Sequence, residues 1–243
     1  MKKILIGTHN DGKFKEFSYL ISKRYKKISP TSLKIPSPKE TGKTFYSNSV
    51  LKANFFSNYV SYPVISDDSG LCIKALNNKP GIFSARLAKK YGSFYKAMKF
   101  ILKKMKNKKN RSAYFICSLS FKQKNQRAIN VVGKVYGTIT YKILGKNGFG
   151  YDPIFKPNLK KITFGQMNHY KKIRLDHRYQ AFVKLKKKLK LSKFVIWYLI
   201  NIKILRNFFI FKTKCPDFPF DFAVKWKIIN RFYSIFTFPC IIN

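Results

Sequence analysis

The segment Val64-Ile65-Ser66-Asp67-Asp68-Ser69-Gly70-Leu71 constrains the possible folds of this chain more than any other stretch. Its apolar start predicts a buried strand that opens at Pro63 and ends at Asp67, and its Ser-Gly pair predicts a turn after the two acids. Two adjacent carboxylates at the end of a buried strand need an explanation, because the whole chain has only 9 Asp and Glu against 51 Lys and Arg.

Two explanations exist for this acidic pair. Asp and Ser favour turns and helix caps, so an ordinary turn would account for both residues. Alternatively, the pair forms a Mg²⁺ site, because this cation binds through one or two carboxylates together with substrate phosphates. The local pattern alone leaves both interpretations open.

The net charge of +42 also has two interpretations. Nucleic-acid binding would explain it, since Lys and Arg neutralise phosphate backbones. Compositional drift would explain it as well, because the lysines are spread along the whole chain and dedicated phosphate-binding proteins favour Arg forks. We favour drift. If Lys replaced acids wherever it was tolerated, the few acids that remain within 1–190 have a role. These acids are Asp11, Glu16, Glu40, Asp67, Asp68, Asp152 and Asp176.

The length of 243 residues allows one or two domains, and we expect a catalytic domain over 1–190 with a C-terminal extension over 191–243. The four cysteines show no CxxC spacing, which predicts reduced thiols and a cytoplasmic protein without a zinc site or disulfides. The apolar run at the N-terminus is too short for a signal peptide. Polar and charged residues interrupt the apolar run over 194–211, so we expect no membrane span there.

The N-terminal residues predict a phosphate-binding arrangement. Lys2–Gly7 is typical of a short buried strand, and a polar turn leads from it into a helix that begins near Lys13. Free N–H groups and the helix dipole attract anions at such a helix N-terminus, where Lys13 would lie. An ordinary turn with a surface lysine remains the alternative, since no Walker A motif is present. Further helices are expected over Tyr46–Tyr59, Ser93–Met105 and Tyr170–Leu191, with strands over Ser112–Phe121 and Ala128–Thr140.

A glycine-rich loop over Gly145–Gly150 suggests a second part of a ligand site. Glycine allows the backbone to approach a ligand closely, and the neighbouring Phe149 and Tyr151 offer flat faces for a base. Aromatic packing beside a turn is the plain alternative. Further along, Lys172 precedes the adjacent pair His177-Arg178, and this combination favours an anionic or keto-bearing ligand over a lone structural histidine.

Taken in order, these motifs resemble the inosine triphosphate pyrophosphatase family, which hydrolyses non-standard purine nucleoside triphosphates. Each motif is weak by itself, but the ordered set over about 1–185 is specific. The matching pieces are Thr8-x-Asn10-x-x-Lys13-x-x-Glu16, Glu40-Thr41-Gly42-x-Thr44-Phe45, Asn48-x-x-x-Lys52-Ala53, Asp67-Asp68-Ser69-Gly70-Leu71, Pro80-Gly81-x-x-Ser84-Ala85-Arg86, Gly148-Phe149-Gly150-Tyr151-Asp152-Pro153-Ile154-Phe155, Thr163-Phe164, and Lys172 with His177-Arg178.

The resemblance implies a two-lobed α/β fold, in which helices flank a long twisted mixed central sheet and the active-site cleft lies between the lobes. It also implies a homodimer that uses Mg²⁺ and converts ITP, dITP or XTP to the monophosphate and pyrophosphate. No specific nucleic-acid partner is expected. A basic nucleic-acid-binding protein and a catalytically decayed relative remain the alternatives.

The resemblance also assigns roles to residues of this chain. Asp68 matches the general base and Mg²⁺ ligand, and Glu40 is the possible second metal carboxylate. Phe149 and Tyr151 would stack on the base, while His177 and Arg178 would recognise a 6-keto purine. The remaining substrate-binding residues are implied to be Thr8, His9, Asn10, Asp11, Gly12, Lys13, Lys52, Ser69, Arg86, Gly150, Asp152 and Lys172.

Several positions depart from the family pattern. His9 stands where a small residue is usual and would crowd the phosphate loop, and Ser47 replaces a common Glu. Gly165-Gln166 replaces Ala-Glu, and Asp176 replaces the Ser before His-Arg, which would put a negative charge beside the base. These departures leave the reaction class intact and leave the rate and the base selectivity open.

Overall fold

The computed structural model describes residues 1–191. Its strands are β1 (Lys2–Ile6), β2 (Tyr25–Ile28), β3 (Val64–Ile73), β4 (Lys79–Pro80), β5 (Ser112–Lys122), β6 (Ile129–Ile139) and β7 (Phe155–Pro157). Its α-helices are α1 (Asp11–Leu20), α2 (Phe45–Ser57), α3 (Ser84–Lys90), α4 (Phe94–Lys104) and α5 (His169–Ile173), and a last helix spans 177–191. Short 3₁₀ helices are η1 (Thr31–Leu33), η2 (Lys74–Leu76), η3 (Gly81–Phe83), η4 (Asp152–Ile154) and η5 (Phe164–Gln166).

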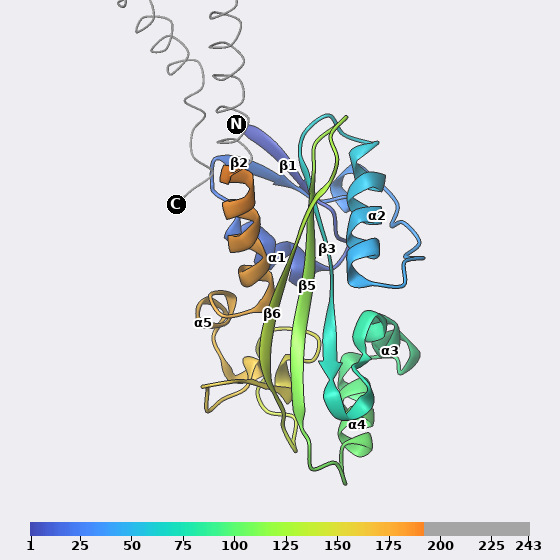
Figure 1. The fold of residues 1–243 in the computed structure, drawn as a ribbon, viewed down its shortest axis with the longest axis vertical. Coiled ribbons are helices and arrows are strands. Elements are labelled where there is room, and N and C mark those ends of the chain that lie inside the picture. The colour runs from blue at the N-terminus through green and yellow to red at the C-terminus, as the bar shows by residue number, and fades with distance from the viewer. Residues whose placement is uncertain (192–243) are drawn as a thin grey trace, which may run out of the picture. The chain divides into compact units, whose positions relative to one another are not determined.

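The strands form one mixed sheet in the order β2-β1-β3-β5-β6-β7, with β4 paired to β3. β1 runs parallel to both β2 and β3, whereas β3, β5 and β6 pair in antiparallel fashion. These three long strands lie side by side through the centre of the described part (Figure 1). The mixed sheet flanked by helices confirms the predicted fold class.

The order in which the chain adds strands to the sheet reverses at β1. It passes from β1 through α1 to β2 on one side, and then returns through α2 to β3 on the other side. Crossovers between parallel strands are right-handed, so the two opposite steps place α1 and α2 on opposite faces of the sheet. Figure 1 shows α1 and α2 on opposite sides of β3. Ligands bind beyond the carboxyl ends of strands at such a point, which here lies between β1 and β3.

The two neighbouring strands separate at this point. β1 pairs with β3 only at Val64 and Ile65, while β5 remains paired with β3 from Val64 to Ile73. Beyond Ile65, the edge of β3 therefore faces the loop that follows β1. Gly7 begins this loop next to β3, and a Cβ at Gly7 would come within 2.5 Å of the Phe56 ring.

Two hydrophobic clusters hold the sheet between its helices. The cluster near β1 and α2 contains Leu5, Phe56 and Val64. The larger cluster joins the far ends of β3 and β5 to α4 and to the segment around η4, and it includes Ile73 and Ile101. These two clusters thus lie toward opposite ends of the long strands.

The predicted end of the central strand is wrong. β3 does not stop at Asp67 but continues through Asp68, Ser69 and Gly70 to Ile73, and β5 pairs with it along the whole length. Pairing with a neighbouring strand outweighs the local turn preference of Ser-Gly. Gly70 is needed there for another reason, because a Cβ at this position would come within 2.6 Å of Ser84 Oγ.

The single helix predicted over Tyr170–Leu191 is also wrong. α5 ends at Ile173, and a new helix starts at 177. Asp176 causes the restart, because its Oδ1 accepts a hydrogen bond of 2.8 Å from the backbone N–H of Tyr179, as a helix N-cap does. The other long helices and strands agree with the predicted ranges to within a few residues.

Two departures from the family pattern stabilise the starts of helices. Ser47 and Thr44 form a reciprocal capping box at the start of α2. Gln166 does the same with Thr163 at the start of η5, where Thr163 N–H donates to Gln166 Oε1 at 3.0 Å. Both substitutions therefore have a local structural role.

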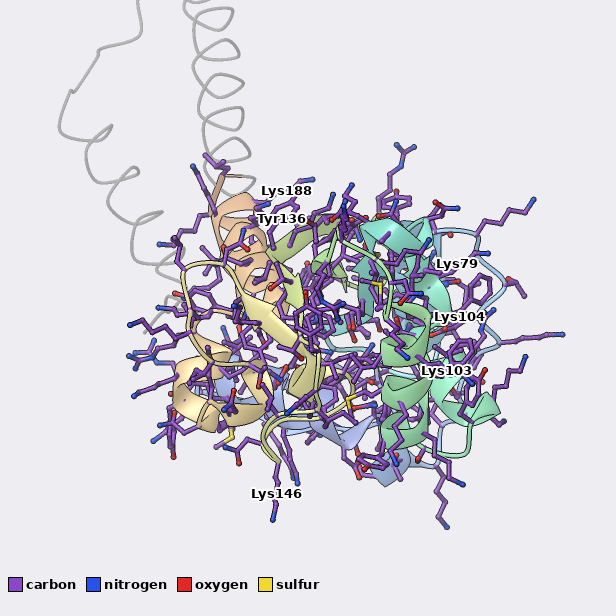
Figure 2. The ribbon with its side chains drawn as sticks, turned by 90° about the horizontal axis from the view of Figure 1, so that it is seen from below. Lys79, Lys103, Lys104, Tyr136, Lys146 and Lys188 are labelled. Carbon is purple, nitrogen blue, oxygen red and sulfur yellow. The ribbon has the colours of Figure 1, made fainter. Side chains whose placement is uncertain are left out.

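Apart from the buried Lys52, Lys172 and Arg178, most basic side chains lie at the surface and point outward in many directions (Figure 2). The labelled lysines come from different elements, with Lys79 on β4, Lys103 and Lys104 on α4, and Lys146 on the loop after β6. This distribution agrees with compositional drift better than with one basic face for nucleic acid.

Within residues 1–191, no helix is long and apolar enough to cross a membrane. The apolar run over 194–211 and most of the predicted extension over 191–243 lie outside the described residues.

Candidate active site

Three consecutive side chains of β3 bind three different parts of the molecule. Asp67 Oδ2 lies 2.9 Å from Lys13 Nζ, Asp68 Oδ2 accepts from Asn48 Nδ2 at 2.9 Å, and Ser69 Oγ accepts from Arg178 at 3.2 Å. Successive side chains of a strand point to opposite faces. Asp67 and Ser69 thus face α1 and the helix that starts at 177, whereas Asp68 faces α2.

The loop after β1 brings Lys13 to this strand. Asn10 caps α1, since its Oδ1 accepts from Lys13 N at 3.0 Å, and its own N–H donates to Thr8 Oγ1 at 3.2 Å. The ring of His9 contacts residues outside this loop, with its Nε2 2.9 Å from the Ile35 carbonyl oxygen. Asp11 is exposed in the first turn of the helix.

Asp67 is a strongly acidic group. Burial raises its pKa, but the charges of Lys13, Arg178 and Lys52 outweigh burial and lower the pKa to about 2. Its Oδ1 is buried without a hydrogen-bond partner in the described residues. Asp67 is therefore ionised at neutral pH and holds Lys13 beside the strand.

Asp68 has the opposite character. Burial raises its pKa above the ordinary value, although Lys52 and Lys13 act against this effect. Asn48 holds the carboxylate in place, and its own side-chain oxygen accepts a hydrogen bond of 2.8 Å from Gly42 N–H. A raised pKa makes Asp68 the better proton acceptor of the two carboxylates.

Glu40 is the second acid on this face. Its Oε1 lies 2.6 Å from Lys52 Nζ, and its charge contributes to the raised pKa of Asp68. Residues 1–191 contain no group of three or more His, Cys, Asp or Glu side chains that would hold a metal without help. Asp68 and Glu40 carry carboxylate oxygens, the type of ligand that Mg²⁺ takes, commonly one or two together with substrate phosphates.

A buried ionic cluster lies on the other face. Glu16 on α1 binds two cations, with Oε1 at 2.6 Å from Lys172 Nζ and Oε2 at 2.9 Å from Arg178. Lys172 also lies 2.6 Å from Asp152 Oδ2. All four side chains are nearly inaccessible to solvent. Sequence reasoning expected a role for Glu16, as one of the few acids that remain and as part of a family motif one turn after Lys13, but did not say which role.

Phe149 covers this cluster. Lys172 Nζ and the Arg178 guanidinium carbon lie 4.7 and 4.9 Å from its ring centroid. Its N–H donates to Asp152 Oδ2 at 2.8 Å, and Gly150 adopts a positive φ of 66°, which suits glycine. A Cβ at Gly12 would come within 2.6 Å of the Phe149 ring, so the glycine-rich loop meets the N-terminus of α1.

Three predicted site residues make contacts of their own within the protein. Tyr151 is buried in the larger hydrophobic cluster, and its hydroxyl donates to the Ser84 carbonyl at 2.9 Å. Arg86 is exposed and donates to the Glu40 carbonyl at 2.9 Å. The His177 ring is buried and stacks on Phe115 at 4.8 Å, and burial lowers its pKa well below the ordinary value.

Comparisons with known proteins give a consistent result. A sequence model described as the Ham1 family matches residues 4–188. A dITP/XTP pyrophosphatase of Caulobacter vibrioides is 39% identical over 186 residues, which cover 76% of this chain and 96% of the relative. The Ham1 protein of Staphylococcus aureus shares the fold with a TM-score of 0.70 at 34% identity, covering 79% of this chain and 100% of that one. A HAM1 protein of Coxiella burnetii gives a TM-score of 0.71 at 32% identity, covering 78% and 99%.

Proposed function

Since the chain belongs to the Ham1 family, we propose that it hydrolyses non-standard purine nucleoside triphosphates such as dITP, ITP and XTP to the monophosphate and pyrophosphate. The observation that carries this proposal is the run Asp67-Asp68-Ser69 on β3, which joins Lys13, Asn48 and Arg178. A purine nucleoside triphosphate has a strongly anionic triphosphate and a polar base. Lys13 offers a positive charge to the phosphates, and Arg178 offers hydrogen-bond donors to the base.

The triphosphate would bind where β1 and β3 separate. The capped N-terminus of α1 offers free N–H groups, and Lys13 lies beside it. Lys52 lies on the opposite face, where Asp67 and Asp68 raise its pKa against the effect of burial. Lys52 therefore stays charged and adds to the neutralisation of the phosphates.

Asp68 would act as the general base. It accepts a proton from a water whose oxygen forms a bond to the α-phosphorus, while the bond from that phosphorus to the bridging oxygen breaks and pyrophosphate leaves with the bonding electrons. Asn48 keeps the carboxylate oriented for this transfer. Asp68 and Glu40 would hold Mg²⁺, which supplies charge neutralisation at the phosphates when bound.

The base would lie against Phe149, above the buried cations. Arg178 Nε is buried and makes no hydrogen bond to the described residues. A 6-keto oxygen can accept from such a donor, whereas the 6-amino group of adenine would leave it unpaired. Lys172 also lies over the Phe149 ring, and His177 directly precedes Arg178 in the chain. This arrangement supports selection of keto purines over adenine.

We also propose that the protein is a cytoplasmic homodimer, on the strength of the family resemblance. Size-exclusion chromatography with light scattering measures the mass directly. A dimer supports this part of the proposal, and a monomer at micromolar concentration would remove it without affecting the proposed reaction.

Pyrophosphate release from dITP, XTP and ATP with Mg²⁺ tests the proposed reaction. We expect kcat/KM for dITP and XTP to exceed that for ATP by at least about 100-fold, because a site that hydrogen-bonds a keto group rejects an amino group. Equal rates for all three would refute base selection. No release from any of them, together with salt-dependent RNA binding, would favour the nucleic-acid interpretation.

A further inference from the structure

Asp176 is a fourth acid in a buried region where three other acids already contact three cations. It lies between α5 and the helix that starts at 177, and its exposed fraction is 0%. Its Oδ1 caps that helix through the N–H of Tyr179. Its Oδ2 is buried and has no hydrogen-bond donor within the described residues. Helix capping therefore accounts for the burial of Oδ1, but nothing yet accounts for the burial of Oδ2 without a hydrogen bond.

The charged groups around Asp176 come from three elements. Burial raises the pKa of Glu16 on α1, and a side-chain hydrogen bond with Asp176 is among the interactions that lower it. Lys172 on α5 and Arg178 on the last helix are the neighbouring cations, and the buried thiol of Cys117 on β5 lies on the sheet side. Two carboxyl groups that face each other in a buried site do not both ionise readily.

Counting the charges around Arg178 leads to the same conclusion. Three acids in this region, Glu16, Asp67 and Asp152, contact three cations, Lys13, Lys172 and Arg178. A fourth ionised acid would leave one buried negative charge without a partner, which is costly in a protein interior. A neutral Asp176 keeps the cluster balanced.

The two acids differ in their affinity for a proton. Burial raises the pKa of Asp176 well above its ordinary value, and the charge of Glu16 raises it further. Burial also raises the pKa of Glu16, but Arg178 and Lys172 outweigh burial and lower it. A single shared proton therefore belongs to Asp176. This differs from the sequence expectation of a negative charge at Asp176.

We propose that Asp176 is a protonated positioning residue, whose carboxyl O–H donates to Glu16 and holds Glu16 where it binds both Lys172 and Arg178. The inference rests on the proposed function in one respect, namely that Lys172 and Arg178 lie beside the proposed site of the base. When Asp176 loses this proton, its carboxylate and that of Glu16 repel each other, and the contacts of Glu16 with Lys172 and Arg178 weaken. Binding of the base then weakens, while Asp68 on the other face is untouched.

This arrangement predicts how stability depends on pH. A group whose pKa is raised by folding contributes stability below its ordinary pKa, and this contribution is lost as the pH rises through the raised value. The variant Asp176→Asn keeps the cap and a hydrogen-bond donor but cannot ionise. The melting temperature of Asp176→Asn relative to that of the wild type should therefore increase as the pH rises from about 5 to about 9. Melting curves that stay parallel over this range would overturn the proposal.

Infrared spectroscopy tests the proton itself. The difference spectrum between the wild type and Asp176→Asn should show the carbonyl band of a protonated carboxyl group at neutral pH. In Glu16→Gln the opposing charge is gone, so Asp176 should ionise and the band should disappear at lower pH. A wild type without this band at neutral pH would also overturn the proposal, whether or not the protein is an active pyrophosphatase.

Kinetics test the positioning role. In the wild type, KM for dITP should rise with pH more steeply than in Asp176→Asn or Asp176→Ser, which retain an uncharged donor. The values of kcat should stay similar, because the general base is elsewhere. Identical KM profiles in all three proteins would show that Asp176 does not position the base site. Absence of turnover, with the infrared band present, would count against the proposed function alone.

Discussion

The substitution Glu16→Gln removes the acid that connects the two buried cations. Glu16 lies 2.6 Å from Lys172 and 2.9 Å from Arg178, and all three side chains are at most 4% exposed. Removing one partner from a buried ion pair costs about 3–5 kcal/mol, because a charge is left without compensation. Lys172 keeps Asp152 at 2.6 Å, and Asp176, which we expect to ionise once Glu16 is neutral, compensates part of the Arg178 charge. We therefore expect a loss near the lower limit, about 3 kcal/mol.

Such a loss is readily measured. For a domain of this size, 1 kcal/mol shifts the melting temperature by about 2–4 °C, so Glu16→Gln should melt about 6–12 °C lower than the wild type. Far-UV circular dichroism is a suitable signal, because the described residues form well-defined helices and strands whose loss it reports.

Glu40→Gln is the matched control. The same Glu-to-Gln change breaks a pair of the same 2.6 Å length, to Lys52, but Glu40 has 31% of its side chain exposed. A partly solvated pair contributes about 1 kcal/mol or less. If Glu40→Gln destabilised the protein as much as Glu16→Gln, or if neither shifted the melting temperature, the reasoning about the buried cluster would be refuted.

Three further predictions follow from single contacts. Gly70→Ala should cost about 1–3 kcal/mol of stability in urea titrations, because its Cβ would meet Ser84 Oγ; an unchanged midpoint would contradict the packing. Phe149→Ala should lower kcat/KM for dITP about 5- to 150-fold through lost stacking, and an unchanged value would exclude Phe149 from the base site. Asp67 has a pKa of about 2, so the stability it adds above its usual pKa is lost as the pH falls toward that value. Asp67→Asn should be less stable at neutral pH and lack this part of the acid dependence in melting experiments.

Most of the fold could be predicted from periodicity and motif order. The long strands and helices are set by local hydrophobic patterns, and the family motifs specify the mixed sheet. The end of β3 could not be predicted, because pairing with β5 decides it and no local pattern reports that pairing. The helix break at Asp176 was missed for a related reason. In the sequence, an Asp inside a long helical pattern looks like a residue on the exposed face of the helix. Only the structure shows that Asp176 is buried and accepts a hydrogen bond from Tyr179 N–H.

The site was predictable only in part. The phosphate loop, the acidic pair and the residues Lys172 and Arg178 stand out as motifs. The role of Glu16 does not, because its partners are more than 150 residues away in the sequence. Tyr151 illustrates the opposite difficulty, since an aromatic residue in a glycine-rich loop suggests base stacking while the structure packs it in the core. Its predicted contact with the base stays a prediction.

The most direct test of the whole account is pyrophosphate release from dITP by Asp68→Asn. Asp217→Asn makes the same change at an acid far from Asp68 in the sequence, to which no role is assigned, and serves as the control. We predict that Asp68→Asn lowers kcat by at least about 100-fold, as expected for loss of a general base, while calorimetry still detects dITP binding. Asp217→Asn should behave as the wild type does. If Asp68→Asn released pyrophosphate at the wild-type rate, the assignment of the central carboxylate on β3 would be contradicted.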